Sequence, residues 1–145
     1  MVRFETSRFG ILEVDEKKTI TFPEGILGFP DIRHYILMDH KDTHLKWLQA
    51  VDNPDVAFIV AASSILSLDY SRELDAATKQ CLQLEKDEDL VILVILRVEG
   101  EKVIPNSQGP ILLNASRMKG MQVVLEKIEA GRSSQASFQR TNSGR

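Results

Sequence analysis

Apolar and polar positions alternate over short stretches in the first part of the chain. Residues 2–6, 10–14 and 19–22 each show this alternation, or a β-branched and aromatic cluster, between turn-forming residues, which is typical of strands. Proline and glycine then punctuate residues 23–31, where fixed or unusual backbone angles interrupt any strand. We therefore expect three short strands followed by a loop of defined shape.

Three longer apolar features mark the middle of the chain. Residues 34–38 and 45–49 flank a short polar connection, which predicts a β-hairpin. Residues 56–62 follow a cluster of turn formers and are apolar throughout, as a buried strand is. Residues 90–96 are also apolar at every position, so a strand there needs cover on both faces and is expected to be central.

A helix and three more strands complete the predicted pattern. Residues 76–82 contain good helix formers over about two turns. Residues 103–106, 111–114 and 120–125 are short, mostly apolar stretches at close spacing, which favours an antiparallel barrel or sandwich. The sequence thus predicts a mainly β fold with one short helix.

Length and composition predict one domain and a tail. A chain of 145 residues with 43% hydrophobic side chains can build one compact core. After residue 130 the composition shifts to Gly, Ser, Gln, Arg and Asn, with Phe138 as the one large apolar residue. Such a segment buries too little apolar surface to order itself. We expect a domain over residues 1–130 and a disordered basic tail over residues 131–145.

The predicted domain is acidic. The tail holds three of the 18 Lys and Arg and none of the 21 Asp and Glu, so residues 1–130 carry 15 basic against 21 acidic side chains, a formal charge of −6. This sign offers no net attraction to a phosphate backbone and favours encounters with basic proteins. The acidic run 85–89 is either a solvated turn or, with Asp69, Glu73 and Asp75, an acidic surface for a basic partner. No direct nucleic-acid binding is expected.

Cysteine content and apolar run lengths bear on the compartment. The one cysteine, Cys81, cannot form an intramolecular disulfide, which agrees with a reducing cytosol. The longest apolar runs fall short of the ~20 residues that span a bilayer, and residues 1–20 show no secretory signal pattern. We expect a cytoplasmic protein that does not associate with membranes.

The candidate catalytic groups have simpler explanations. His34, His40 and His44 could ligate a metal, but Lys41-Asp42-Thr43 reads as a hairpin connection, where helical spacing has no meaning. Cys81 lacks a recognisable base and is expected to be buried in the predicted helix. The sequence contains none of the usual motifs of nucleotide, acyl or metal-assisted chemistry. We therefore expect no enzyme activity, metal site, cofactor or small-molecule substrate.

Five segments resemble the FliW family of flagellar assembly factors, in the same order and at similar spacing over residues 3–126. They are Gly25-Ile26-Leu27-Gly28-Phe29-Pro30 with Tyr35, Trp47-Leu48-Gln49-Ala50-Val51-Asp52 with residues 56–60, Leu68-Asp69-Tyr70, Asn106 with Gly109-Pro110-Ile111-Leu112-Leu113-Asn114, and residues 122–125. The family usually has leucine after the asparagine of the fourth segment, where this chain has Ser107.

The resemblance implies both a fold and a function. The fold is a small antiparallel β-barrel, which agrees with the strand pattern. Members of the family bind cytoplasmic flagellin, and once flagellin is exported the free factor binds the RNA-binding regulator CsrA at a site away from its RNA surface. CsrA then releases flagellin messenger RNA, so repression of its translation ends.

Two groups of residues follow from this resemblance. We expect partner contacts from Leu27, Phe29, Asp69, Tyr70 and Glu73. Phe29 stands out because an aromatic side chain in a Gly and Pro loop is expected to lack neighbours that hide it. The other motif residues have a structural interpretation, as loop formers or core side chains, with Trp47 and Phe58 expected in the core. They are Gly25, Gly28, Pro30, Trp47, Gln49, Phe58, Asn106, Pro110 and Asn114.

A small-ligand-binding β-barrel is the alternative function. An apolar cavity with a few convergent polar groups would favour it, whereas a filled interior with an exposed apolar and acidic patch favours protein binding. A hydrolase would instead require a cleft with clustered, perturbed titratable groups.

Overall fold

The computed structural model describes residues 1–125 and 138–140, without the side chains of Glu73 and of the last three of these residues. Its strands are β1 Val2–Thr6, β2 Gly10–Val14, β3 Ile20–Thr21, β4 His34–Asp39, β5 Leu45–Ala50, β6 Ala57–Ala62, β7 Leu90–Glu99, β8 Lys102–Pro105, β9 Ile111–Asn114, β10 Lys119–Leu125 and β11 Phe138–Arg140. Helix α1 covers Ala76–Cys81, and 3₁₀ turns cover Glu16–Lys18, Ser71–Glu73 and Asp87–Asp89.

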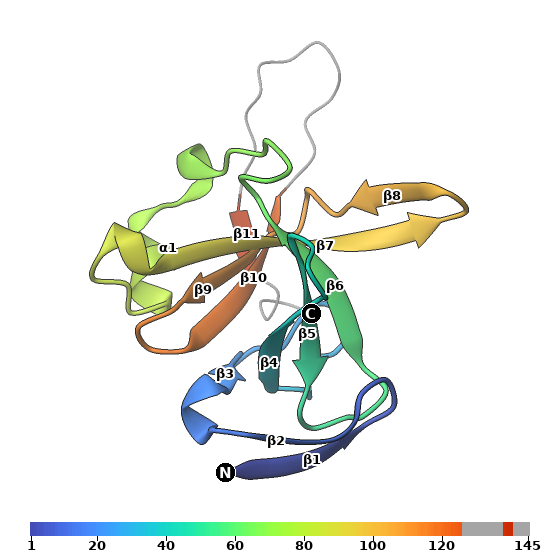
Figure 1. Cartoon of the computed structure of the whole chain (residues 1–145). Helices are drawn as coiled ribbons and strands as arrows, with labels where there is room; N and C mark the ends of the chain where they lie inside the picture. Colours follow the sequence, from blue (N-terminus) through green and yellow to red (C-terminus); the bar gives the residue numbers. More distant parts are fainter. Residues whose placement is uncertain (126–137, 141–145) are drawn as a thin grey trace.

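Seven strands close into a barrel in the order β10, β3, β4, β5, β6, β7 and β9, and β9 returns to β10 (Figure 1). The pairings are antiparallel except for one parallel bridge between Lys119 in β10 and Thr21 in β3. β8 and β11 extend the sheet beyond the ring by pairing with the ends of β7 and β10. The predicted mainly β barrel is confirmed.

β7 is the central strand that its uniform apolar run predicts. It pairs with β6 along one edge and with β9 and β8 along the other. Val91, Leu93 and Ile95 join the core of the barrel interior, whereas Ile92 and Val94 join apolar clusters beneath residues 66–84. Both faces of the strand are therefore covered, each by a different layer.

The loop between β3 and β4 closes one end of the barrel. Phe22, Ile26 and Ile32 are buried and share the interior core with Tyr35 and Leu48. The Phe22 and Tyr35 rings meet edge to face with centroids 5.2 Å apart. Because the loop turns three apolar side chains inward, its intervening residues are held in fixed positions at the surface.

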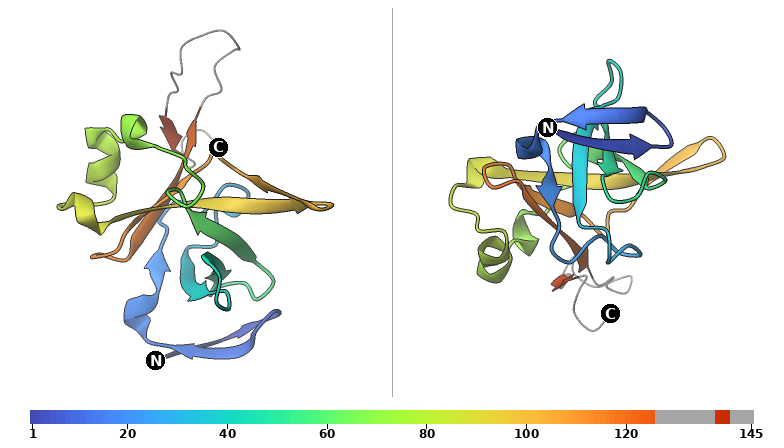
Figure 2. Two further views of the ribbon diagram at one scale, coloured as in Figure 1. Left: turned by 45° about the horizontal axis from the view of Figure 1, so that its top comes forward. Right: turned by 90° about the horizontal axis from the view of Figure 1, so that it is seen from below.

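β1 and β2 form a separate hairpin on the outside of the barrel, visible at the bottom of Figure 1 and apart from the ring in Figure 2. The Ser7 backbone amide donates to the Pro54 carbonyl at 2.9 Å, and Phe9 meets Trp47 edge to face at 5.7 Å. The Arg8 guanidinium lies 4.3 Å from the Trp47 ring centroid. Trp47 is thus buried as predicted, but under this hairpin rather than in the barrel interior.

Helix α1 covers the predicted segment. Asp75 caps it by accepting a hydrogen bond from the Thr78 amide at 2.7 Å. Thr78 and Leu82, four residues apart, are buried on one face. Cys81 lies off that face and is exposed, so the prediction that it is buried is wrong.

The predicted tail falls almost wholly outside the described residues. Within residues 131–145 the structure describes Phe138–Arg140, which pair with β10 as β11. The prediction of a disordered tail otherwise concerns residues outside the described part of the chain and stays a prediction.

Candidate protein-binding surface

The loop that closes the barrel presents two apolar side chains to solvent. Leu27 is 42% exposed and Phe29 36% exposed. The backbone around them is held by two turns, since the Phe29 amide donates to the Ile26 carbonyl at 2.7 Å and, just before, the Gly25 amide donates to the Phe22 carbonyl at 2.9 Å. Rigid, exposed apolar side chains of this kind are suited to anchor a protein partner.

Glycine is required at the start of this loop. Gly25 has φ +71°, and a Cβ there would lie 2.5 Å from the Phe29 carbonyl oxygen. Gly28 has φ +92° but open space around it. The structural interpretation of both glycines is therefore consistent with their backbone angles, and Gly25 also permits close backbone contact.

Phe29 is not without neighbours. Its ring meets Phe58 edge to face with centroids 5.6 Å apart, and Phe58 in turn lies 6.2 Å from Tyr35. Phe58 is half-buried and packs against the interior core, as predicted. The expectation that nothing hides Phe29 is wrong, because Phe58 packs against its ring and the residue is only 36% exposed.

Gln122 ties this loop to the loop before β9. Its side chain is 2% exposed, and its Oε1 accepts from the Leu27 amide at 2.7 Å. Its Nε2 donates to the Gly109 carbonyl at 3.0 Å. The buried side-chain amide of Gln122 thus forms hydrogen bonds with the backbone of two loops that are far apart in the sequence.

The loop before β9 connects in turn to Tyr70. The Tyr70 hydroxyl donates to the Ser107 carbonyl at 2.8 Å, and the Leu125 amide donates to the Gln108 carbonyl at 2.7 Å. Tyr70 is only 5% exposed and packs with Val94 and Leu125. Because Ser107 contacts Tyr70 through its backbone carbonyl, this contact does not depend on the side chain at position 107.

Asp69 is exposed beside Tyr70 and remains charged. Hydrogen bonds from the Ser71 amide and hydroxyl, with a smaller contribution from Arg72, hold the pKa of the Asp69 carboxyl below its usual range. Glu73 follows in the same 3₁₀ turn, and its side chain lies outside the described part of the structure. We use the term loop surface for Leu27, Phe29, residues 107–109, Asp69 and Tyr70.

The remaining motif residues differ in burial and in hydrogen bonding. Gln49 is fully buried and its Nε2 donates to the Ala50 and Val56 carbonyls. The Asn106 carbonyl accepts from Gly109, and the buried Pro110 accepts from Val123. Pro30 is exposed in the closing loop.

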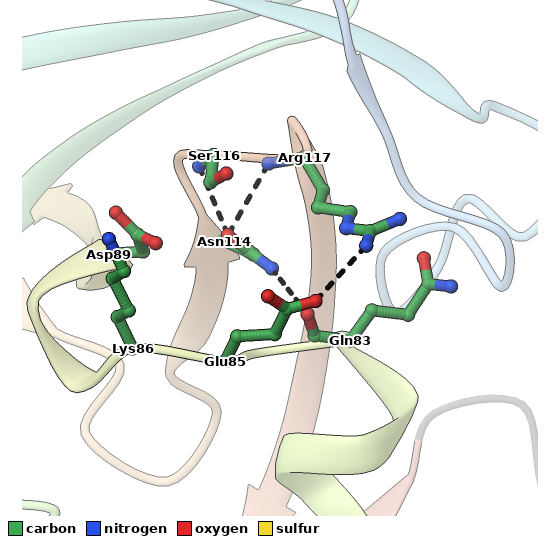
Figure 3. Close-up of a pocket in the computed structure, with 7 residues that line it drawn as sticks. All are labelled: Gln83, Glu85, Lys86, Asp89, Asn114, Ser116 and Arg117. Atoms are coloured by element: carbon green, nitrogen blue, oxygen red, sulfur yellow. Dashed lines mark hydrogen bonds and ion pairs between the residues drawn. The ribbon is translucent and has the colours of Figure 1, made fainter.

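Asn114 organises a polar pocket of about 200 Å³ at the other end of β9 (Figure 3). Its Nδ2 donates to the Leu82 and Gln83 carbonyls, and its Oδ1 accepts from the Ser116 and Arg117 amides. Arg117 also pairs with Glu85 at 3.2 Å. The pocket is lined by Gln83, Glu85, Lys86, Asp89, Asn114, Ser116 and Arg117. Its two acids and two bases balance, so it offers no strongly charged site.

The acidic run 85–89 is partly neutralised by neighbours. Glu85 pairs with Arg117, and Asp87 lies 3.7 Å from Lys79. Asp75 serves as the cap of α1. At Asp69 the pKa is lowered chiefly by hydrogen bonds from Ser71, with a smaller contribution from Arg72.

Residues 1–125 and 138–140 contain neither a metal-binding cluster nor a membrane-spanning helix. In this part of the chain no three His, Cys, Asp or Glu side chains converge, and no helix is long and apolar enough to cross a bilayer. His34 contacts Asp52 at 3.2 Å, while His40 Nδ1 accepts from Trp47 Nε1 at 2.9 Å. The hairpin assignment for residues 34–49 is confirmed.

Sequence reasoning missed the residues that join the loops. Gln122 was part of a motif, yet nothing marked it as the link between Leu27 and Gly109. A Cβ on Gly109 would lie 2.9 Å from Gln122 Nε2, so this glycine is needed for the contact. A polar side chain amid the apolar residues of β10 was the available signal, because a buried amide requires partners.

The fold and the loop surface define a closed small β-barrel with exposed apolar anchors at its covered end. The chain belongs to the FliW family, whose model, described as FliW protein, matches residues 3–135. It is 37% identical over 132 residues to a flagellar assembly factor FliW of Thermoanaerobacter pseudethanolicus, covering 88% of each chain. It is 37% identical over 123 residues to that of Geobacter sulfurreducens, covering 83% of this chain and 77% of the other.

A solved structure supports the same assignment. A crystal structure of the flagellar assembly factor FliW superposes with a TM-score of 0.79 at 27% identity, covering 97% of this chain and 96% of that one. The family inferred from the five sequence segments is therefore confirmed.

Proposed function

We propose that this protein is a cytoplasmic, non-enzymatic flagellar assembly factor that binds flagellin and, when free, binds CsrA. Binding to CsrA would act allosterically and end the repression of flagellin messenger RNA translation. The proposal rests on the family membership, since relatives that match most of this chain are named flagellar assembly factors.

The loop surface is the proposed contact region. The main support for this region is the pair of exposed apolar side chains of Leu27 and Phe29. Buried Gln122 holds the backbone of Leu27, and the ring of Phe58 packs against Phe29. Exposed Asp69 adds a negative charge that complements a basic partner. Tyr70, being buried, would act by positioning the loop at Ser107 rather than by touching a partner.

The ligand-barrel alternative is weaker on the same observations. The interior is filled by side chains such as Phe22, Ile26 and Tyr35. The apolar cavity at the other barrel end measures about 190 Å³, less than the ~300–1,000 Å³ typical of small-molecule sites. We therefore favour protein binding.

Calorimetric titration tests the proposal. The full chain would be titrated at two salt concentrations with purified CsrA and, separately, with monomeric flagellin from the same organism. Saturable binding of both is expected, and binding of CsrA should weaken as salt screens the acidic surface. A folded sample that binds neither partner would refute the proposal. Asp69→Lys should then weaken CsrA binding, while Asp42→Lys in the β4–β5 connection serves as the matched control.

A further inference from the structure

The barrel end opposite the closing loop is open and apolar. Along β9 and β10, Ile111 and Gln122 lie toward the closed end, whereas Leu113 and Met118 lie toward the other. A cavity of about 190 Å³ opens there, lined by Lys18, Ile20, Leu37, Val91, Leu113, Asn114, Ala115 and Met118. It is therefore distinct from the loop surface and exposes part of the interior core.

The lining selects an apolar group. Ile20, Leu37, Val91, Leu113 and Met118 all belong to or pack against the interior core. Asn114 adds little recognition, because its side-chain amide already makes four hydrogen bonds within the chain. Lys18 is the one charged residue in the lining.

The volume matches a single side chain. An apolar cavity of roughly 150 Å³ is known to admit a benzene-sized group, so the cavity here has room for one leucine, isoleucine or phenylalanine side chain. Sites for whole small molecules are larger, at ~300–1,000 Å³. A single side chain of a polypeptide fits this size. The polar pocket drawn in Figure 3 shares Asn114 with the cavity, so it is available to residues that flank the inserted side chain.

Lysines lie at and near the rim, in a turn that also contains the acids Asp15 and Glu16. Among residues 1–125, Lys17, Lys18 and Lys119 form no ion pair, whereas Arg117 is held by Glu85. Lys119 pairs through its backbone with Thr21 of β3, and Lys18 ends the 3₁₀ turn that leads into the same strand. Carboxylates on a partner would complement these ammonium groups.

We propose that this open barrel end is a docking site for a protein segment that inserts one large apolar side chain into the cavity and places an adjacent Asp or Glu against Lys18. The site goes beyond the proposed loop-surface contacts and depends on neither CsrA nor flagellin being the partner.

A peptide titration followed by methyl NMR tests the site on the full chain. The probe is the acetylated and amidated peptide Gly-Glu-Leu-Glu-Gly, with Gly-Glu-Ala-Glu-Gly and Gly-Lys-Leu-Lys-Gly as controls. The probe should shift methyl signals of Leu37, Val91 and Leu113. Replacing its leucine by alanine should weaken binding by about tenfold or more, given the apolar surface lost.

Two variants make the test specific. Ala115→Leu should fill the cavity from its rim and abolish the shifts, and Lys18→Glu should reverse the charge preference between the two leucine peptides. Lys102→Glu on β8 is the matched control and should leave binding unchanged. Equal affinity for all three peptides, or shifts confined to Leu27, would overturn the proposal. Because the experiment uses neither CsrA nor flagellin, a negative result would refute the docking site without bearing on the proposed function.

Discussion

Gln122 and Leu27 are 95 residues apart in the sequence, yet the Gln122 side-chain oxygen accepts a hydrogen bond from the Leu27 amide at 2.7 Å. The same side chain donates to the Gly109 carbonyl. The buried side-chain amide of Gln122 therefore connects the closing loop to the loop before β9, whose Ser107 carbonyl accepts a hydrogen bond from the Tyr70 hydroxyl. The shape of the loop surface depends on this link.

Gln122→Leu should destabilise the fold. The substitution keeps a similar volume but leaves the Leu27 amide and the Gly109 carbonyl without their partner, which costs about 1–3 kcal/mol in free energy of unfolding. Urea denaturation would measure the change. Gln80→Leu, at an exposed position of α1, is the control and should change stability little. Equal stability of both variants would show that Gln122 is not a structural link.

Gly25→Ala and Gly28→Ala should differ in effect. Both positions have positive φ, so both variants carry backbone strain, but only at Gly25 would the new Cβ meet the Phe29 carbonyl oxygen. We expect Gly25→Ala to lose about 1–3 kcal/mol more stability than Gly28→Ala, as an added methyl group in a packed site does. Thermal unfolding of the two variants gives the comparison, and a matching loss would contradict the close contact.

Tyr35 should make the protein sensitive to alkaline pH. Burial, and to a smaller extent Asp52, raise the pKa of the Tyr35 phenol above its usual range, and its hydroxyl has no hydrogen-bond partner among the described residues. Since the folded pKa exceeds the unfolded value of ~10, this stability is complete below pH ~10. It falls by about 1.4 kcal/mol per pH unit above that, as the unfolded chain loses the proton first.

Tyr35→Phe isolates that effect. The variant keeps the ring that packs on Phe22 and Phe58 but cannot ionise. Its free energy of unfolding, measured from pH 8 to 11.5, should fall less steeply than that of the unmodified protein above pH ~10. Parallel curves would mean that Tyr35 ionises as readily in the folded state as in the unfolded one.

His40→Ala should loosen the attachment of the outer hairpin. Trp47 Nε1 loses its acceptor, at a cost of about 0.5–1.5 kcal/mol, and the ring beneath Arg8 and Phe9 becomes less fixed. Trp47 is the one tryptophan of the chain, so its fluorescence reports the change directly. His44→Ala, in the exposed connection between β4 and β5, is the control and should leave the emission unaltered.

Local patterns predicted the elements well because each depends on nearby residues. The alternating stretches became β1 and β2, and the uniform run at 90–96 became β7 with both faces covered. Closure of the barrel could not be predicted from local sequence patterns. It depends on one bridge between Lys119 and Thr21 and on β7 pairing with β9 at one end and with β8 at the other.

The candidate site was predictable only in part. Leu27 and Phe29 are exposed as expected, but burial of Tyr70 and support of Phe29 by Phe58 arise from tertiary packing. Cys81 shows the same limit, since a helix of six residues does not reveal which face meets the core. The open barrel end could not be foreseen, because a cavity is defined by what several distant segments fail to fill.

The most direct test of the loop surface is a titration of CsrA into three forms of the protein: unmodified, Leu27→Ser with Phe29→Ser, and the control Ile11→Ser, which changes an apolar residue that is 56% exposed on the outer hairpin. Loss of two anchors should weaken binding at least tenfold, or about 1.4 kcal/mol, while the control binds as the unmodified protein does. Unchanged affinity of the double variant, with the fold intact, would contradict the assignment of Leu27 and Phe29 as partner contacts.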